Sequence, residues 1–253
     1  MPWDPDRYEQ FKAERYAPFE DLARLIDVRE DLRVVDLGCG TGELTRRLAD
    51  LLPRSDVVGI DSSREMLARA EEQARPGLRF EERAIEAVSG EWDLIFSNAA
   101  IQWVDDHASL VPRLLTLLRP GGQLVVQVPS NFDHATHTII EEIGAEEPFR
   151  AALGGSAHTW PVLSVETYAE MLYASGGTDI TVFEKVYPHV LENADALADW
   201  MSGTALVPYM ERLPERLREP FVARYRERLR QRFPSSPVFF GFRRILFAAT
   251  QPE

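Results

Sequence analysis

The sequence contains little cysteine, little lysine and no long apolar run, and each of these is required by particular functional classes. Its 253 residues include one cysteine, which excludes an internal disulfide and any zinc site built on several cysteines. No stretch approaches the ~20 apolar residues that a membrane helix needs. The acidic, aromatic start MPWDPDRYEQFK lacks the basic-then-apolar pattern of a signal peptide. We therefore expect a cytoplasmic enzyme or binding protein without a membrane partner.

Positive charge is also scarce. The chain has 28 Lys and Arg residues against 41 Asp and Glu residues, a formal net charge of −13. Because phosphate contacts need clustered cations, this balance argues against nucleic acid as a partner. Only Lys12 and Lys185 are lysines. The excess of arginine reflects either a coding preference or a use of guanidinium groups as bidentate partners of carboxylates.

Strands and helices are predicted to alternate through the first half of the chain. Short β-branched runs are followed by stretches with helical spacing of apolar residues, the pattern of βαβ units and a doubly wound parallel sheet. The expected strands lie in 32–42 (which breaks into glycines), 56–63, 78–82, 92–98 and 123–129, and the expected helices in 14–27, 43–52, 63–74 and 107–118.

The second half is less regular. A helix is expected over 165–177, with strands over 179–190 and 237–249. The stretches 131–160 and 193–232 are predicted to be helical, the second cut by Pro208, Pro214 and Pro220. We interpret 131–160 and 193–235 as insertions that form a helical cap over the active site, on a core made of 1–130, 161–192 and 236–253. Ligands of open α/β folds bind at the carboxyl ends of the strands, where a cap would exclude water.

The strongest local signal is the run VVDLGCGTG, residues 34–42, which follows a strand and precedes a helix. Glycines let the backbone turn sharply and approach a ligand closely, near the helix N-terminus. Asp61 ends the next strand, where its carboxylate can accept hydrogen bonds from both hydroxyls of a ribose. The alternative interpretation is a structural turn that binds no ligand, with an Asp that faces solvent. The combined strand, loop, helix, strand and Asp favour a ribose-bearing cofactor.

The charges around the loop discriminate between such cofactors. A pyrophosphate would lie close to Asp36 and Glu43, and like charges oppose it. The glycine spacing, G-x-G-x-G, also differs from the G-x-G-x-x-G of dinucleotide folds. S-adenosylmethionine carries a sulfonium and an ammonium but no phosphate, so acidic neighbours suit it.

VVDLGCGTG together with GIDSS resembles the class I S-adenosylmethionine-dependent methyltransferases. The resemblance implies a Rossmann-like α/β fold: a seven-stranded, mostly parallel sheet with the last strand antiparallel and helices on both faces. The segments WDPDRYEQFKAER, WDLIFSNAAIQW and LLRPGGQLVVQVP are similar to those of the trans-aconitate 2-methyltransferases, which form a methyl ester on a small tricarboxylate.

The resemblance assigns residues to the cofactor S-adenosylmethionine. Gly38 and Gly40 would face its methionine part, and Ser62 and Met66 would border the adenine. Where this family usually has an Asp for the adenine amine, this chain has Ala84, so the contact would fall to Ile85. The full expected set is Asp36, Gly38, Gly40, Asp61, Ser62, Met66, Ile85, Asn98, Ala99 and Trp103.

The acceptor side needs cations and no base. A carboxylate is ionised at pH 7, so we expect positioning alone, with no catalytic side chain and no metal. NAAIQW is not the Asn-Pro-Pro-aromatic motif of amino-methylating enzymes. Alternation along a strand puts Arg243 and Arg244 on opposite faces, so one of them points at the site. The expected substrate set is Tyr8, Arg15, Trp103, Tyr209 and Arg244.

Four functions remain open at this point. The favoured one is transfer of a methyl group to a carboxylate of a small polycarboxylic acid such as trans-aconitate. An enzyme acting on a malonyl group held by a carrier protein would need a basic docking patch, which the acidic composition disfavours. The third is a cofactor-binding sensor without catalysis, and the fourth is a nicotinamide dehydrogenase.

Overall fold

The structure is a computed structural model that describes residues 12–155 and 159–253. The chain forms two compact units. The first, the sheet unit, consists of 16–129, 161–185 and 244–253, and the second, the helical unit, includes 130–160 and 186–243. Residues 186–192 and 236–243, which the sequence analysis assigns to the core, belong to the helical unit because their buried side chains join its apolar cluster.

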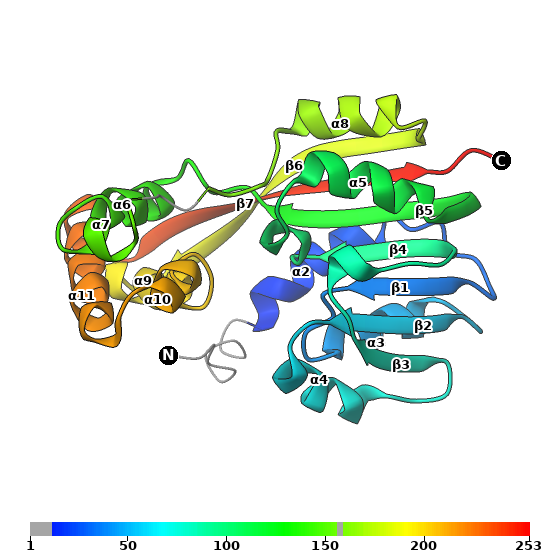
Figure 1. Ribbon diagram of the computed structural model, residues 1–253, viewed down its shortest axis with the longest axis horizontal. Helices are drawn as coiled ribbons and strands as arrows, with labels where there is room; N and C mark the ends of the chain where they lie inside the picture. Colours follow the sequence, from blue (N-terminus) through cyan, green and yellow to red (C-terminus); the bar gives the residue numbers. More distant parts are fainter. Residues whose placement is uncertain (1–11, 156–158) are drawn as a thin grey trace. The chain divides into compact units, whose positions relative to one another are not determined.

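The sheet has seven strands in the order β3-β2-β1-β4-β5-β7-β6 (Figure 1). Neighbours from β3 through β5 are parallel, and β7 runs antiparallel to β5. This confirms the expected seven-stranded, mostly parallel Rossmann-like sheet with an antiparallel last strand. The strands are β1 Arg33–Leu37, β2 Asp56–Asp61, β3 Leu78–Glu82, β4 Trp92–Asn98, β5 Leu118–Pro129, β6 Thr178–Leu191 and β7 Val238–Thr250.

Helices cover both faces of the sheet, which explains the nearly continuous apolar character of β1, β4 and β5. Apolar side chains of α2 Lys12–Ala23, α3 Glu43–Leu51 and α4 Arg64–Ala70 pack in one cluster with those of the strands. Side chains of α5 His107–Thr116 and α8 Val165–Ala174 pack in a second cluster on the other face. The carboxyl ends of the parallel strands are thus held between two apolar layers.

Strand β5 begins five residues earlier than predicted, at Leu118 instead of Gln123, and the expected helix 107–118 ends at Thr116. The reason is a register shift: Leu118 pairs with Trp92 and Gln123 pairs with Leu94, so the residues between them are accommodated as an irregularity. The turn residues Pro120 and Gly121 therefore lie within the strand rather than in a separate loop.

The predicted helix over 193–232 is three helices: α9 Ala194–Ser202, α10 Val207–Arg212 and α11 Glu215–Arg232. Pro208 and Pro214 lie where helices start, as a residue without an N–H prefers. The expected break at Pro220 is wrong, because this proline lies inside α11. The other helices of this unit are α6 Ala135–Gly144 and α7 Phe149–Ala152.

Helix α11 lies between α6 and α9 in the helical unit. Phe221, Tyr225 and Leu229 recur every four residues, share one face and are fully buried. Their apolar cluster includes side chains of both neighbouring helices and the helical-unit parts of β6 and β7. The Tyr225 hydroxyl donates to the Thr136 carbonyl at 3.0 Å, which satisfies the polar end of a buried ring.

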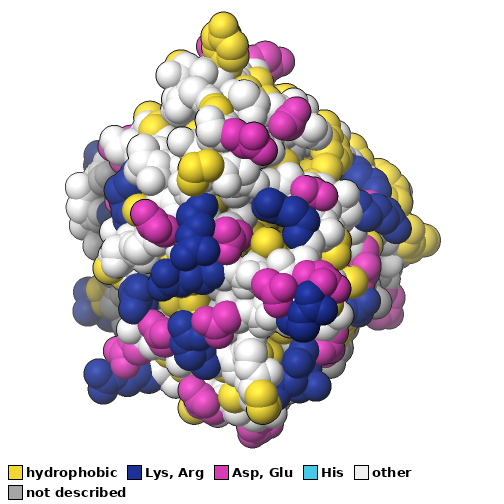
Figure 2. Space-filling model, turned by 90° about the vertical axis from the view of Figure 1, so that its right-hand side faces the viewer, with side chains coloured by type: hydrophobic (Ala, Val, Ile, Leu, Met, Phe, Trp, Pro, Cys, Tyr) yellow, Lys and Arg dark blue, Asp and Glu magenta, His cyan; other side chains and the backbone are white. Residues whose placement is uncertain are grey.

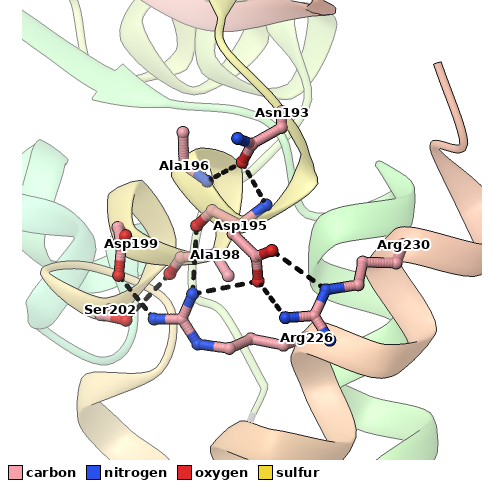
Figure 3. Close-up of polar contacts among 8 residues, drawn as sticks. All are labelled: Asn193, Asp195, Ala196, Ala198, Asp199, Ser202, Arg226 and Arg230. Carbon is pink, nitrogen blue, oxygen red and sulfur yellow. Dashed lines mark hydrogen bonds and ion pairs between the residues drawn. The ribbon is translucent and has the colours of Figure 1, made fainter. Parts of the chain in front are cut away.

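Two rows of ion pairs flank this apolar stripe. On one side Arg224 and Arg228 contact Glu146, which lies two residues beyond the end of α6, and Arg228 also contacts Glu142 in the last turn of α6. On the other side Arg226 and Arg230 contact Asp195 of α9, and Arg226 also reaches Asp199 (Figure 3). Each guanidinium is thereby tied to the carboxylates of the facing segment, a role in which Arg exceeds Lys.

Arg and acidic residues are also paired on the sheet unit. Arg79 contacts Asp56 and Arg54 contacts Glu30, and both kinds of charge are interspersed over the face drawn in Figure 2. Within 12–155 and 159–253, none of the helices combines the length and the apolar character required to cross a bilayer.

Replacing Arg226 by Gln should lower the free energy of unfolding by about 1 kcal/mol at low salt, because the contacts with Asp195 and Asp199 are lost. The loss should shrink in about 1 M NaCl, where the Debye length is about 3 Å. Urea unfolding at the two salt concentrations measures it. Arg216→Gln, at an exposed position of α11, is the control and should change stability little. An equal, salt-independent loss in both variants would contradict the ion-pair account.

Candidate functional site

The glycine loop after β1 turns on three residues with positive φ. Gly38, Gly40 and Gly42 have φ of 71°, 56° and 75°, a region that favours glycine. The Gly38 and Cys39 amides both donate to the Ile60 carbonyl of β2, at 2.8 and 2.9 Å. The loop is therefore anchored to the carboxyl end of the neighbouring strand.

The glycines differ in what surrounds them. A Cβ on Gly38 would lie 2.3 Å from the Ala100 Cβ, and one on Gly42 would lie 2.7 Å from the Phe80 ring. A Cβ on Gly40 would meet nothing within 4 Å. Gly38 and Gly42 thus serve internal packing, whereas the backbone at Gly40 has room for close approach of a ligand.

Asp61 closes the loop from the end of β2. One carboxylate oxygen accepts from the Gly40 amide at 3.0 Å, and the other accepts from the Ser63 amide at 2.8 Å. Each oxygen keeps a second acceptor position, since a carboxylate offers about four lone-pair sites. The side chain is partly exposed, so the vicinal hydroxyls of a ribose have acceptors to bind.

The residues expected beside the adenine lie at the ends of β2 and β3. Ser62 is exposed, and Met66 is half-buried in the first turn of α4, where its amide donates to the Ser63 hydroxyl. Ile85 starts a short 3-10 helix, and its Cδ1 lies 3.8 Å from the Cβ position of Gly38. Ala84 is exposed immediately before it. Ile85 therefore contacts the glycine loop, and Ala84 offers no polar side chain.

The segment after β4 lies against the same loop through Ala100. Asn98 ends β4, and Ala99 has a φ of 55°, a strained value for a residue with a Cβ. The Ala99 amide donates to the Gln127 carbonyl at 2.9 Å, and the Gln102 side chain donates to the Ala99 carbonyl at 2.7 Å. Trp103 follows with 49 % of its surface exposed.

A buried histidine, His107, holds this segment through a hydrogen bond to the Ile101 carbonyl. His107 donates from Nε2 to the Ile101 carbonyl at 2.8 Å, so its Nδ1 accepts from the Tyr168 hydroxyl at 2.5 Å. The tautomer is fixed by the carbonyl, which can only accept. Burial lowers the pKa of His107, which keeps the ring neutral. The short helix that carries Trp103 is therefore tied to the apolar core.

Asp36 is the buried acid of the site. It is 4 % exposed on β1, and its carboxyl accepts from the Thr45 hydroxyl at 2.6 Å. Burial raises the pKa of Asp36 to about 7; the hydrogen bond from Thr45 opposes this shift and the charge of Asp61 adds to it. Asp36 thus holds a proton over part of the neutral range, and a cation close by would favour its release.

The residues expected to bind the substrate are divided between the two units. Arg244 is 8 % exposed in the sheet unit and donates to the Gln127 side-chain oxygen at 2.9 Å. Arg243 contacts Asp133 in the helical unit. Tyr209 is 2 % exposed in that unit, with its ring stacked on Phe221. Tyr8 and the side chain of Arg15 lie outside the described residues.

Three residues that contact the candidate site residues were not predicted from the sequence: Thr45, Gln102 and Gln127. Gln127 had a visible signal, a polar residue in the apolar strand run LVVQVP. Thr45 and Gln102 had none, because their roles depend on contacts with the Asp36 carboxyl and with the Ala99 carbonyl. In the part of the chain that the structure describes, no group of three or more His, Cys, Asp and Glu residues is arranged to hold a metal ion.

Comparison with known proteins gives consistent results. Residues 29–174 match the model of a methyltransferase domain family. A trans-aconitate 2-methyltransferase of Deinococcus radiodurans is 49 % identical over 259 aligned residues, which cover 100 % of both chains. A protein of the same name from Variovorax paradoxus is 37 % identical and covers 92 % of this chain and 91 % of its own.

Solved structures share the fold at low sequence identity. The YcgJ protein of Bacillus subtilis superposes with a TM-score of 0.62 at 16 % identity, over 94 % of this chain and 99 % of its own. A phosphoethanolamine N-methyltransferase of Haemonchus contortus, solved with S-adenosylhomocysteine, has a TM-score of 0.55 at 19 % identity, over 94 % of this chain and 53 % of its own. These likenesses concern the fold.

The pH dependence of stability tests the state of Asp36. A pKa of about 7 in the folded chain lies above the unfolded value of about 4. The stabilisation from the bound proton is therefore complete below pH 4 and is lost as the pH rises through 7. Asp36→Asn keeps an acceptor for Thr45 and cannot ionise. At pH 8 it should be more stable than the wild type by on the order of 4 kcal/mol, with the gap closing toward pH 4.

Thermal unfolding between pH 4 and pH 8 measures this gap. Asp105→Asn, at an exposed position, is the control and should follow the wild-type profile. Parallel profiles of Asp36→Asn and the wild type would show that Asp36 is not the titrating group.

Proposed function

The chain belongs to the S-adenosylmethionine-dependent methyltransferases, in the family of the trans-aconitate 2-methyltransferases, and from this we propose that it methylates a carboxylate of trans-aconitate. The products are a monomethyl ester and S-adenosylhomocysteine. The observation that carries the proposal is the 49 % identity with the Deinococcus radiodurans protein over the whole of both chains. The geometry of the sheet unit supports both the cofactor and the acceptor.

The residues of the sheet unit fit S-adenosylmethionine. Asp61 keeps acceptor positions for the ribose, and the backbone at Gly40 has the space that a ligand needs. Asp36 places a carboxyl beside the loop, which suits an ammonium and a sulfonium. Gly38, Asn98 and Ala99 would face the methionine part, and Ser62, Met66 and Ile85 would border the adenine. When bound, S-adenosylmethionine supplies an electrophilic methyl group.

The protein contributes orientation and exclusion of water. A carboxylate is already ionised at pH 7, so it would accept the methyl group from bound S-adenosylmethionine without a proton being removed first. Positioning of the two reactants contributes several kcal/mol, up to about 7–11 in favourable cases. We propose that no side chain acts as a general base, and that Trp103 lies beside the reacting groups.

The acceptor needs a cation inside an acidic protein. Arg244 supplies a buried guanidinium beside the carboxyl ends of β4 and β5, where Asn98 and Ala99 also lie. Guanidinium binds carboxylates bidentately, which fixes their orientation as well as their charge. Arg15, Tyr8 and Tyr209 remain proposed contributors, as does the helical cap. The cytoplasm remains the proposed compartment, supported by a chain with one cysteine.

The direct test is turnover with S-adenosylmethionine labelled in its methyl group and a panel of small di- and tricarboxylates. We expect trans-aconitate to give a base-labile methyl ester that releases labelled methanol. Absence of turnover with every carboxylate in the panel would overturn the proposal.

The missing acid before Ile85 gives a second test. Because Ala84 is exposed at the start of the short helix over 85–87, Ala84→Asp should add an acceptor for the adenine amine. The affinity for S-adenosylhomocysteine should rise by roughly 3- to 10-fold, the value of one hydrogen bond of about 1 kcal/mol. Calorimetric titration measures it, and Ala87→Asp, at an exposed position two residues after Ile85, is the control. An equal gain in the control would indicate a general charge effect.

A further inference from the structure

Polar side chains form a row across one face of the sheet unit, close to the carboxyl ends of its parallel strands. Gln127 of β5 is paired with Asn98 of β4 and with Leu246 of β7. Arg244 lies two residues from Leu246, and side chains two apart on a strand share a face. Asn98, Gln127 and Arg244 therefore point to the same side of the sheet.

Gln127 has a buried polar atom that no hydrogen bond satisfies, as does the neighbouring Asn98, whose Oδ1 has no partner within the described residues. The Gln127 side chain is 0 % exposed, and within the described residues its Nε2 has no hydrogen-bond partner. An unsatisfied buried donor costs about 1–3 kcal/mol, so it calls for an explanation. Gln123 lies on the same strand, and its side-chain oxygen accepts from the Asp27 amide. Neither polar atom of the Gln123 side chain is both buried and without a partner.

The orientation of the Gln127 amide is fixed by chemistry. Its Oε1 accepts from the Arg244 guanidinium at 2.9 Å, and a guanidinium can only donate. The other end of the amide, Nε2, must then be the donor. The same reasoning fixes Gln102, whose Nε2 donates to the Ala99 carbonyl and whose buried Oε1 remains as an acceptor.

The unsatisfied buried atoms of these side chains are thus acceptors in one place and a donor in another. Gln102 and Asn98 each have a buried oxygen left as an acceptor, on the two sides of Ala99 in the sequence. Gln127 offers a donor next to Arg244, on the side of β7. Acceptors suit a ligand that carries cations, whereas a donor beside a guanidinium suits an anion.

We propose that Gln127 is a specificity-determining residue that binds, together with Arg244, a carboxylate of the acceptor other than the one that is methylated. This inference rests on the proposed function and deepens it, because it makes a second carboxylate a requirement for tight binding. Gln127 both holds the guanidinium in place through Oε1 and donates to the carboxylate through Nε2. A reacting carboxylate would lose nucleophilic character in such a clamp, so the clamped group is the spectator.

The test replaces one atom. Gln127→Glu keeps the shape and an acceptor for Arg244 but exchanges the donor for a negative charge. We expect the KM for trans-aconitate to rise about 100-fold and kcat at saturation to stay within about 3-fold. The Kd of S-adenosylhomocysteine should be unchanged. Calorimetric titration of trans-aconitate into the protein with S-adenosylhomocysteine gives a readout independent of turnover.

Gln123→Glu is the matched control, with the same exchange on the same strand, and should keep the wild-type KM. Gln127→Met removes the donor without adding charge and should raise KM about 10-fold, which keeps the test valid should the charged variant fold poorly. If the wild type neither binds nor methylates trans-aconitate, the proposed function fails, and this inference with it. If the wild type does both and the Gln127 variants match Gln123→Glu, or lose kcat with KM unchanged, the inference alone is overturned.

Discussion

The hydrogen bond from the Gly40 amide to the Asp61 carboxylate is the contact on which the cofactor side of the site depends. It joins the loop after β1 to the end of β2 and sets the position of both. The same carboxylate receives the Ser63 amide, which orients the start of α4. The side chain that we propose binds the ribose is therefore also a structural support, and loss of its charge would disturb the loop. The loop and the start of α4 are thus preorganised by one carboxylate.

The opposite side of the site is organised by pairing across the antiparallel strands β5 and β7. Arg244 is buried at low cost because its guanidinium donates to an amide oxygen. Under the proposed function, Arg244 lies on the side of the acceptor and the carboxyl of Asp36 lies on the side of the methyl donor.

Much of the cofactor side could be predicted from the sequence, because positive φ and a strand-terminal carboxylate require residue types that local patterns reveal. Gly40 and Asp61 are examples. The contact between Gln127 and Arg244 joins residues 117 positions apart, and it depends on a register between strands that no local pattern encodes. Burial of Tyr209 likewise depends on helix packing. Helix limits were least predictable where a proline such as Pro220 is tolerated inside a helix that its neighbours hold in place.

The paired rows beside α11 have an effect beyond stability. Arginines that already pair with Glu146 and with the carboxylates of α9 contribute little to the electrostatic field at a distance. The chain has 41 acidic residues against 28 basic ones, and this excess of negative charge therefore dominates the electrostatic potential that an approaching molecule experiences. A tricarboxylate diffuses toward this protein against repulsion, and at physiological ionic strength screening confines that repulsion to about 8 Å. Encounter with the acceptor is in this way favoured by salt, the reverse of the usual behaviour of enzymes that attract their substrates by opposite charge.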